Sequence, residues 1–164
     1  MNRNFLTAVL LLITSLVFAQ DFKQAVGIRV GYTGGIEYRI FSDELNSYKF
    51  LIGSRDRGLI VHAMKEWHRI DLFPSTDQLS FVYGGGVHIG YERWDQQYYN
   101  YNYSYYVTHT AFIAGIDGLA GLEYLFRKVP ISLGFEVKPY FDLFGKEMFD
   151  LQLFDFALTA KYNF

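Results

Sequence analysis

The sequence predicts an all-β fold, an eight-stranded antiparallel up-and-down transmembrane β-barrel. Three observations support this prediction. The 164 residues include 14 Tyr, 16 Phe and 15 Gly but only 3 Pro, a composition that favours strands. Apolar and polar residues alternate with a period of two along segments bounded by turn residues. The last segment keeps this alternation up to the final Phe164.

Eight segments show the alternation, and most are close to the roughly 9 to 11 residues that a tilted strand needs to cross a bilayer. They are residues 25–32, 35–41, 48–55, 58–68, 79–91, 111–126, 130–141 and 151–164. An even number of antiparallel strands places both chain ends on one side, which in outer-membrane barrels is the periplasm. Outer connections are then expected at 33–35, 55–58, 92–110 and 142–150.

Each of the first four segments has one apolar face, which we expect to point outward if the sheet closes in lipid. Lys65 is the exception, because it falls on the apolar face and would have to lie near an interface. The expected outward residues are Val26, Ile28 and Val30, then Ile36, Tyr38 and Ile40, then Phe50 and Ile52, and finally Leu59, Val61, Ala63 and Trp67.

The last four segments follow the same rule, and the alternation of the seventh is unbroken over 131–137. Aromatic residues near the strand ends fit the girdles of a membrane barrel. The expected outward residues are Phe81, Tyr83, Val87 and Ile89, then Ile116, Ala120 and Leu122, then Ile131, Leu133 and Phe135, and finally Phe154, Phe156 and Leu158.

The opposite faces carry the charges and predict a polar network inside the barrel. An eight-stranded barrel is just wide enough for side chains to fill, so we expect a filled lumen that does not conduct ions. Six basic and six acidic residues balance within this set. The network consists of Arg29, Glu37, Arg39, Lys49, Arg55, Glu66, His88, Asp117, Glu123, Glu136, Lys138, Asp155 and Lys161.

The first 19 residues predict a secretory signal peptide that is cleaved after Ala19, because Arg3 precedes an apolar run and small residues precede Gln20. Residues 20–164 would then form the barrel domain. The absence of cysteine excludes disulfides and a lipid-modified cysteine. A formal net charge of −2 gives no reason to expect a nucleic-acid partner.

The long outer connection at 92–110 is rich in tyrosine. A tyrosine ring with a polar tip suits stacking on a glycan or contact with a protein, so this loop is a candidate contact surface. In the alternative interpretation the tyrosines only extend the fifth and sixth strands as a paired ribbon. The six residues are Tyr98, Tyr99, Tyr101, Tyr103, Tyr105 and Tyr106.

The segments "AVGIRVGYTGGIEYRIF", "YGGGVHIGY", "ISLGFEVKPYFDLFG" and "ALTAKYNF" resemble the small outer-membrane β-barrel proteins common in Bacteroidota, which are barrels of the OmpA/OmpX type. The resemblance spans residues 25–164. It implies an outer-membrane location, with membrane lipid and the outer-membrane assembly machinery as partners. Tyr162 and Phe164 on the last strand would then form the signal that this machinery reads.

The expected role is structural or adhesive, without catalytic residues, cofactor or metal. One alternative is an enzyme that modifies membrane lipid, with His62, Glu66, His68 and His88 as candidates. No serine shows an evident partner base, and no compact spacing of histidines and carboxylates indicates a metal site. The other alternative is a soluble, lipocalin-like periplasmic barrel that turns its aromatic face inward around a small ligand.

Overall fold

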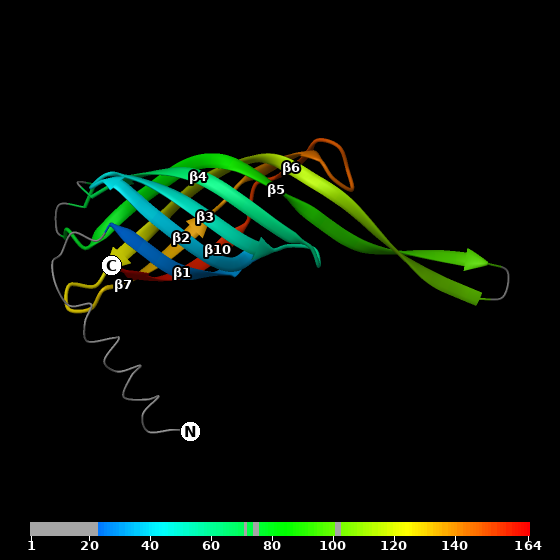
Figure 1. Cartoon of the computed structure of the whole chain (residues 1–164), viewed down its shortest axis with the longest axis horizontal. Helices are drawn as coiled ribbons and strands as arrows, with labels where there is room; N and C mark the ends of the chain where they lie inside the picture. Colours follow the sequence, from blue (N-terminus) through cyan, green and yellow to red (C-terminus); the bar gives the residue numbers. More distant parts are fainter. Residues whose placement is uncertain (1–22, 71, 74–75, 101–102) are drawn as a thin grey trace, which may run out of the picture.

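The chain forms a closed antiparallel β-barrel (Figure 1) in a computed structural model that describes residues 23–70, 72–73, 76–100 and 103–164. Neighbouring strands pair antiparallel, and pairing of β5 with β6 closes the ring. The strands are β1 (Gln24–Gly31), β2 (Gly34–Asp43), β3 (Asn46–Ser54), β4 (Leu59–Arg69), β5 (Leu79–Asn100), β6 (Tyr103–Leu125), β7 (Ile131–Val137), β8 (Tyr140–Phe144), β9 (Asp150–Gln152) and β10 (Phe156–Asn163).

These ten strands make eight barrel strands, because β7 continues into β8 and β9 continues into β10. Both interruptions lie at Pro139, which has no N–H to donate to the ladder. The three residues 153–155 of the last barrel strand lie opposite only two residues, 138–139, of its neighbour. The pairing of these two barrel strands therefore contains a β-bulge. The prediction of an eight-stranded antiparallel barrel is confirmed. No helix among the described residues is long and apolar enough to cross a membrane.

The first strand begins and the last strand ends at the same end of the barrel, here called the terminal end. The backbone of Phe164 exchanges hydrogen bonds with Gln24, at 2.8 and 2.9 Å. The links after β2, β4 and β6 lie at this end, and the links after β1, β3 and β8 lie at the opposite end, here called the arm end. This arrangement agrees with the even strand count expected from the sequence.

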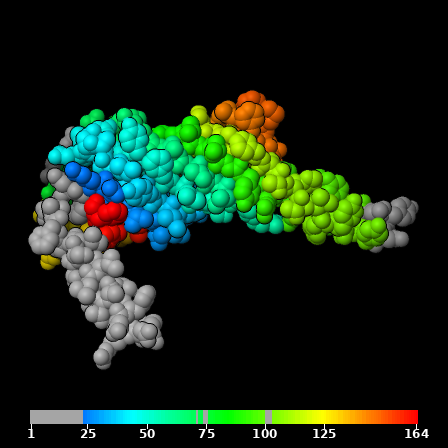
Figure 2. Space-filling view, viewed as in Figure 1, coloured from blue at the N-terminus to red at the C-terminus, as the bar shows by residue number. Residues whose placement is uncertain are grey.

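The alternative interpretation of residues 92–110 is confirmed for the described residues, because β5 and β6 continue as a paired ribbon up to Asn100 and Tyr103 instead of ending at a loop after Tyr91. This ribbon, residues 92–100 and 103–110, is here called the arm. It projects well beyond the barrel in Figure 1 and remains narrow in the space-filling view of Figure 2. The expected loop at 142–150 is also shorter, since β8 continues to Phe144.

The barrel wall is apolar outside and polar inside. The buried apolar cluster is small and consists of Met64, Val82 and Leu119. The structure therefore contradicts the lipocalin-like alternative, in which the aromatic face would point inward. Exposed outward residues on all eight barrel strands include Val26, Ile28, Val30, Ile36, Phe50, Ile52, Val61, Val87, Ile89, Ile116, Leu133, Phe135, Phe156 and Leu158.

Lys65 lies on the outer face, where the alternation places it. Its ammonium lies 5.3 Å from the centre of the Trp67 ring, a distance at which the cation is attracted by the aromatic face. Trp67 stacks in turn on Tyr83 of the next strand, with ring centres 5.6 Å apart. The lysine is thus held next to aromatic residues near the terminal end of the barrel.

Candidate functional site: the polar lumen and the aromatic arm

The structure places all thirteen residues of the expected polar network inside the barrel, each exposed by less than a tenth. They come from every barrel strand, because the pleat turns alternate side chains of each strand inward. Salt bridges and hydrogen bonds join them into layers along the barrel axis. We describe these layers from the terminal end to the arm end.

The first layer, nearest the terminal end, is organised by Arg39. Its Nε lies 2.7 Å from Glu66 Oε2 and its Nη1 lies 2.9 Å from Glu123 Oε2. The Ser47 hydroxyl donates to Glu66 Oε2 at 3.0 Å and lies 2.8 Å from Nε2 of His68. The sequence analysis found no serine with an evident partner base and therefore missed this serine–histidine contact.

Ser47 does not have the environment of a hydrolytic nucleophile. Its residue is fully buried, and the carboxylate of Glu66 contacts the hydroxyl itself. In a nucleophile–base–acid triad the acidic group orients the imidazole instead. His68 and Glu66 therefore serve as hydrogen-bond partners within the network.

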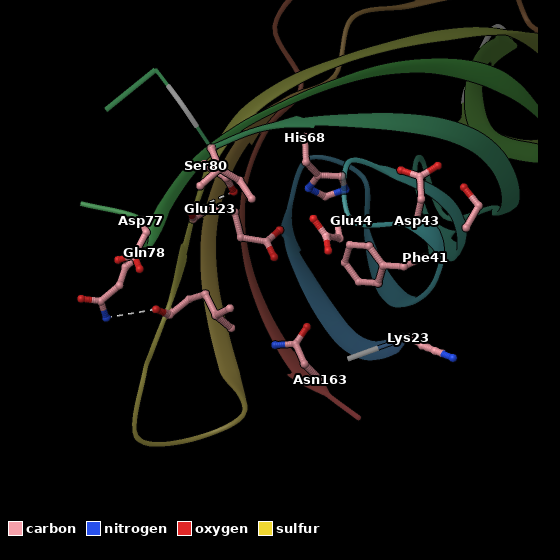
Figure 3. A pocket seen from close by; sticks show the side chains of 13 residues that line it. Lys23, Phe41, Asp43, Glu44, His68, Asp77, Gln78, Ser80, Glu123 and Asn163 are labelled. Atoms are coloured by element: carbon pink, nitrogen blue, oxygen red, sulfur yellow. Dashed lines mark hydrogen bonds between the residues drawn. The ribbon is translucent and has the colours of Figure 1, made fainter. Parts of the chain in front are cut away.

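A pocket of about 510 Å³ opens at the terminal end (Figure 3). Its lining residues include His68, Glu123 and Asn163 of the barrel interior together with Lys23 and Phe41. The first charged layer thus lies at the bottom of this mouth. Figure 3 shows Glu123 and His68 reaching toward the axis from different walls.

The middle layer connects opposite walls of the barrel. Lys49 Nζ lies 2.8 Å from Glu37 Oε2 and 2.8 Å from Glu136 Oε2. Lys161 Nζ lies 3.0 Å from Glu123 Oε2 and 3.2 Å from Glu37 Oε1. Lys49 and Glu37 lie on the adjacent strands β3 and β2, but the other three pairs bridge strands that are not neighbours. These three pairs close the bore with charged side chains.

The third layer lies at the bulge between the last barrel strands. Arg29 Nη1 lies 3.3 Å from Asp155 Oδ1, and Lys138 Nζ lies 3.4 Å from Asp155 Oδ2. Lys138 also contacts Asp117 Oδ1, at 3.1 Å. Asp155 in the bulge and Lys138 before Pro139 thus place one acidic and one basic side chain at the barrel axis.

The fourth layer, nearest the arm end, contains two histidines. His62 Nδ1 lies 2.8 Å from Asp117 Oδ2, and His88 Nδ1 lies 3.2 Å from the same oxygen. His88 Nε2 lies 2.8 Å from Asp142 Oδ1, while Arg55 Nη2 donates to Asp142 Oδ2 at 2.6 Å. His62 and His88, two candidate residues of the lipid-modifying enzyme alternative, therefore lie together. They lie inside the barrel, away from its outer surface.

The expected charge balance of the lumen was wrong. Eight acidic and six basic side chains are buried in the described part of the chain, because Glu92 and Asp142 also point inward. The alternation in the sequence already indicated that both residues point inward. Continuing the alternation from His88 along β5 reaches Glu92, and continuing it from Lys138 along β8 reaches Asp142.

The arm has one aromatic face and one more polar face. Trp94 stacks on His109 and Tyr98 stacks on Tyr105, with ring centres 5.6 and 5.7 Å apart. Tyr103 lies 6.5 Å from Tyr105 on the same face. The sequence-based set missed Trp94 and His109, although both follow from pairing the two strands of the ribbon.

The more polar face carries Tyr99 and Tyr106, so the tyrosines do not form one surface. Tyr99 is 82% exposed. On this face Asp95 accepts hydrogen bonds from Thr108 and from Arg57 of the β3–β4 turn, at 2.7 and 2.8 Å. Tyr101, also expected in the contact surface, lies outside the described residues.

The expected assembly signal lies at the terminal end. Tyr162 belongs to β10, and its ring centre lies 6.2 Å from that of Phe164. Phe164 is 42% exposed on the outer side of the barrel. The expected signal peptide, residues 1–19, lies outside the described residues.

A comparison with solved structures finds a similar fold in the N-terminal β-barrel domain of Pseudomonas aeruginosa OprF. The TM-score is 0.47 and the sequence identity is 14%, and the match covers 86% of this chain and 95% of that domain. No protein-family model matches the chain. No curated protein matches it either.

Proposed function

We propose that the protein is an outer-membrane β-barrel that holds an aromatic arm at the cell surface for contact with a partner. The observation that carries the proposal is the distribution of side chains, with the charges inside and apolar residues over the whole outer wall. Soluble monomers rarely expose such a continuous apolar surface. A closed barrel with an apolar band can cross a bilayer, because its strands pair around the whole ring and leave no open sheet edge.

Aromatic residues at both ends of the wall support a membrane position. Tyr124 and Phe126 lie at the terminal end, while Tyr32 and Tyr91 lie at the arm end, and all four are exposed. The Arg93 guanidinium lies 5.1 Å from the Tyr91 ring centre. Amphipathic rings and cations of this kind are common at membrane interfaces.

The proposal includes the route to the membrane that the sequence suggests. The chain is exported by the signal peptide that ends at Ala19, and the assembly machinery reads Tyr162 and Phe164. The terminal end then faces the periplasm and the arm faces the outside. In this orientation the protein belongs with the small outer-membrane barrels that the sequence resembles.

The lumen has a structural role in this proposal, since the charged layers cross-link the wall. The contact role belongs to the arm. Its nine residues of β5 beyond Tyr91 extend roughly 30 Å at about 3.3 Å per residue, which raises the aromatic face above the membrane. Flat rings with polar tips suit stacking on sugar rings. A glycan is therefore the partner that the arm favours.

The membrane part of the proposal is tested by gel mobility of the outer-membrane fraction with and without boiling in detergent. We expect the protein in the sarkosyl-insoluble fraction and a shift in mobility on boiling, because a closed hydrogen-bonded barrel resists detergent until heated. Recovery in the aqueous fraction without a shift would contradict the proposal.

The contact role is tested by two matched double variants of the arm. Tyr98→Ser with Tyr105→Ser removes the stacked pair from the aromatic face, while Tyr99→Ser with Tyr106→Ser removes two rings from the other face. We expect only the first variant to lose binding of the labelled barrel to a glycan array and adhesion of cells that express it. Unchanged binding and adhesion in the first variant would exclude the role of this face.

A further inference from the structure

Three potential metal ligands converge in the fourth layer of the lumen. His62 and His88 are direct partners in the β4–β5 ladder, and Asp117 of β6 lies beside both. Their nitrogen and oxygen ligand atoms all lie within 4.8 Å of one another, and all three residues are buried. The residues are far apart in sequence, so no spacing signal showed this cluster.

The hydrogen bonds of His88 leave one of its nitrogens facing an acceptor. A neutral imidazole carries a single N–H. If Nε2–H donates to Asp142 Oδ1 at 2.8 Å, the lone pair of Nδ1 faces Asp117 Oδ2 at 3.2 Å. This buried Nδ1 makes no hydrogen bond with a described residue. Two facing lone pairs repel, so this contact needs either a second proton on His88 or a metal ion between the two atoms.

The charge around the cluster also favours a cation. Eight buried acids face six buried bases in the described residues, and the two acids in excess of the expected set are Glu92 and Asp142. Both line a pocket of about 490 Å³ at the arm end. Five acidic and three basic side chains line this pocket, so its potential draws cations toward the lumen.

We propose that the barrel binds a divalent transition-metal ion of the zinc class through His62 Nδ1, His88 Nδ1 and Asp117 Oδ2. Around tetrahedral zinc, with bonds of roughly 2.0–2.1 Å, neighbouring ligand atoms lie about 3.3 Å apart. The distances of 2.8 and 3.2 Å from Asp117 Oδ2 to the two nitrogens need only a small opening. Two imidazoles and one carboxylate suit zinc rather than calcium or magnesium.

The surrounding residues already orient these ligands. Asp142 accepts from the second nitrogen of His88, and Arg55 holds Asp142 in turn. A carboxylate on the far nitrogen is the usual support of a metal-binding histidine. Lys138 occupies the other oxygen of Asp117, which leaves Oδ2 for the metal.

Access to the site runs from the arm end. Asp142 contacts His88 and also lines the arm-end pocket, so this side chain connects the mouth of the barrel with the site. Gly115 provides space here, because a Cβ at this position would lie 2.7 Å from His88 Cε1. Metal binding needs both imidazoles neutral, with their single proton on Nε2 and the lone pair of Nδ1 free. Protons therefore compete with the ion, and binding weakens as pH falls.

The test begins with the native protein, purified in detergent, stripped with EDTA and titrated with Co²⁺. We expect one Co²⁺ per chain, with the visible absorption of a four-coordinate ion, and its displacement by one Zn²⁺. Absence of both signals at neutral pH overturns the proposal. The histidines and carboxylates of this layer are then joined by hydrogen bonds without a metal ion. This measurement needs no variant to fold.

Variants then locate the ion. His62→Gln and His88→Gln should abolish the cobalt spectrum, and Asp142→Asn should weaken affinity roughly 10- to 100-fold. His68→Gln and His109→Gln are matched controls and should bind as the native protein does. Each variant is compared only if it keeps the boiling-dependent shift. Binding retained in both His62→Gln and His88→Gln, or lost in either control, overturns the assignment.

Discussion

Lys49 of β3 and Glu136 of β7 meet across the bore of the barrel, with Lys49 Nζ 2.8 Å from Glu136 Oε2. Their strands are not neighbours in the sheet. Lys49 also holds Glu37 at 2.8 Å, so one ammonium neutralises carboxylates on different walls. Because removal of one partner leaves buried charges unpaired, this contact is a sensitive point of the structure.

Lys49→Met should therefore destabilise the barrel by about 3–5 kcal/mol. The measurement is urea unfolding of the refolded protein in detergent, followed by tryptophan fluorescence. Lys65→Met is the matched control, because it removes a lysine from the outer wall, and it should cause no loss of stability. Equal losses in the two variants would show that the lumen network does not support the fold.

The native protein should form no steady ion channel in a planar lipid bilayer. The charged layers fill an eight-stranded barrel, which leaves no continuous aqueous path. A 16-stranded porin inserted in the same bilayer provides the positive control. Regular conductance steps from the purified native protein would mean that the layers part in the membrane and that the lumen is not closed.

Gly115→Ala should destabilise the barrel, whereas Gly85→Ala should be tolerated. A Cβ at Gly115 would lie 2.1 Å from the Phe141 carbonyl oxygen, while at Gly85 the nearest atom is Asp117 O at 3.4 Å. Overpacking of the first kind costs roughly 1–3 kcal/mol. The unfolding midpoints in urea compare the two variants directly. A smaller loss for Gly115→Ala than for Gly85→Ala would contradict the packing described here.

The base of the arm should stay ordered until the solution is strongly acidic. Hydrogen bonds from Thr108 and Arg57 lower the pKa of Asp95 below its ordinary value of 3.8. A carboxylate with a lowered folded pKa contributes stability that is present above its unfolded pKa and lost as pH falls through the folded pKa.

Amide hydrogen-exchange protection near Asp95 and Thr108 measures this stability. It should remain constant from neutral pH to pH 3.8 and fall below that value, and Asp95→Asn should remove the acid-dependent part. Loss of protection near neutral pH in the native protein would rule out Asp95 as the group responsible.

The alternation of residue types predicted strands with one apolar and one polar face, because successive side chains of a strand point to opposite sides. The alternation alone also permitted a soluble barrel or sandwich, and the predicted signal peptide and the final Phe164 favoured the membrane barrel. The alternation also placed Lys65 and the thirteen lumen residues on their correct faces. The ends of the strands were harder to predict. Glu92 and Asp142 were assigned to loops because turn-like and tyrosine-rich residues obscured where pairing stops.

Contacts between strands lay beyond the sequence pattern. The meeting of His62 and His88 depends on the register of β4 against β5, and the position of Asp117 depends on β6. The same holds for Ser47 and His68, which sit on β3 and β4. A single sequence shows which face a residue occupies but gives no information about how far one strand is shifted along the next.

The central claim, that the apolar outer wall faces lipid, is tested most directly by fluorescence quenching with brominated lipids. Both native tryptophans, Trp67 and Trp94, are replaced by phenylalanine, and a single tryptophan is introduced as Phe135→Trp on the wall or as Tyr99→Trp on the arm. We expect strong quenching at position 135 and none at position 99. Absence of quenching at position 135 in the folded, vesicle-inserted protein would contradict the account.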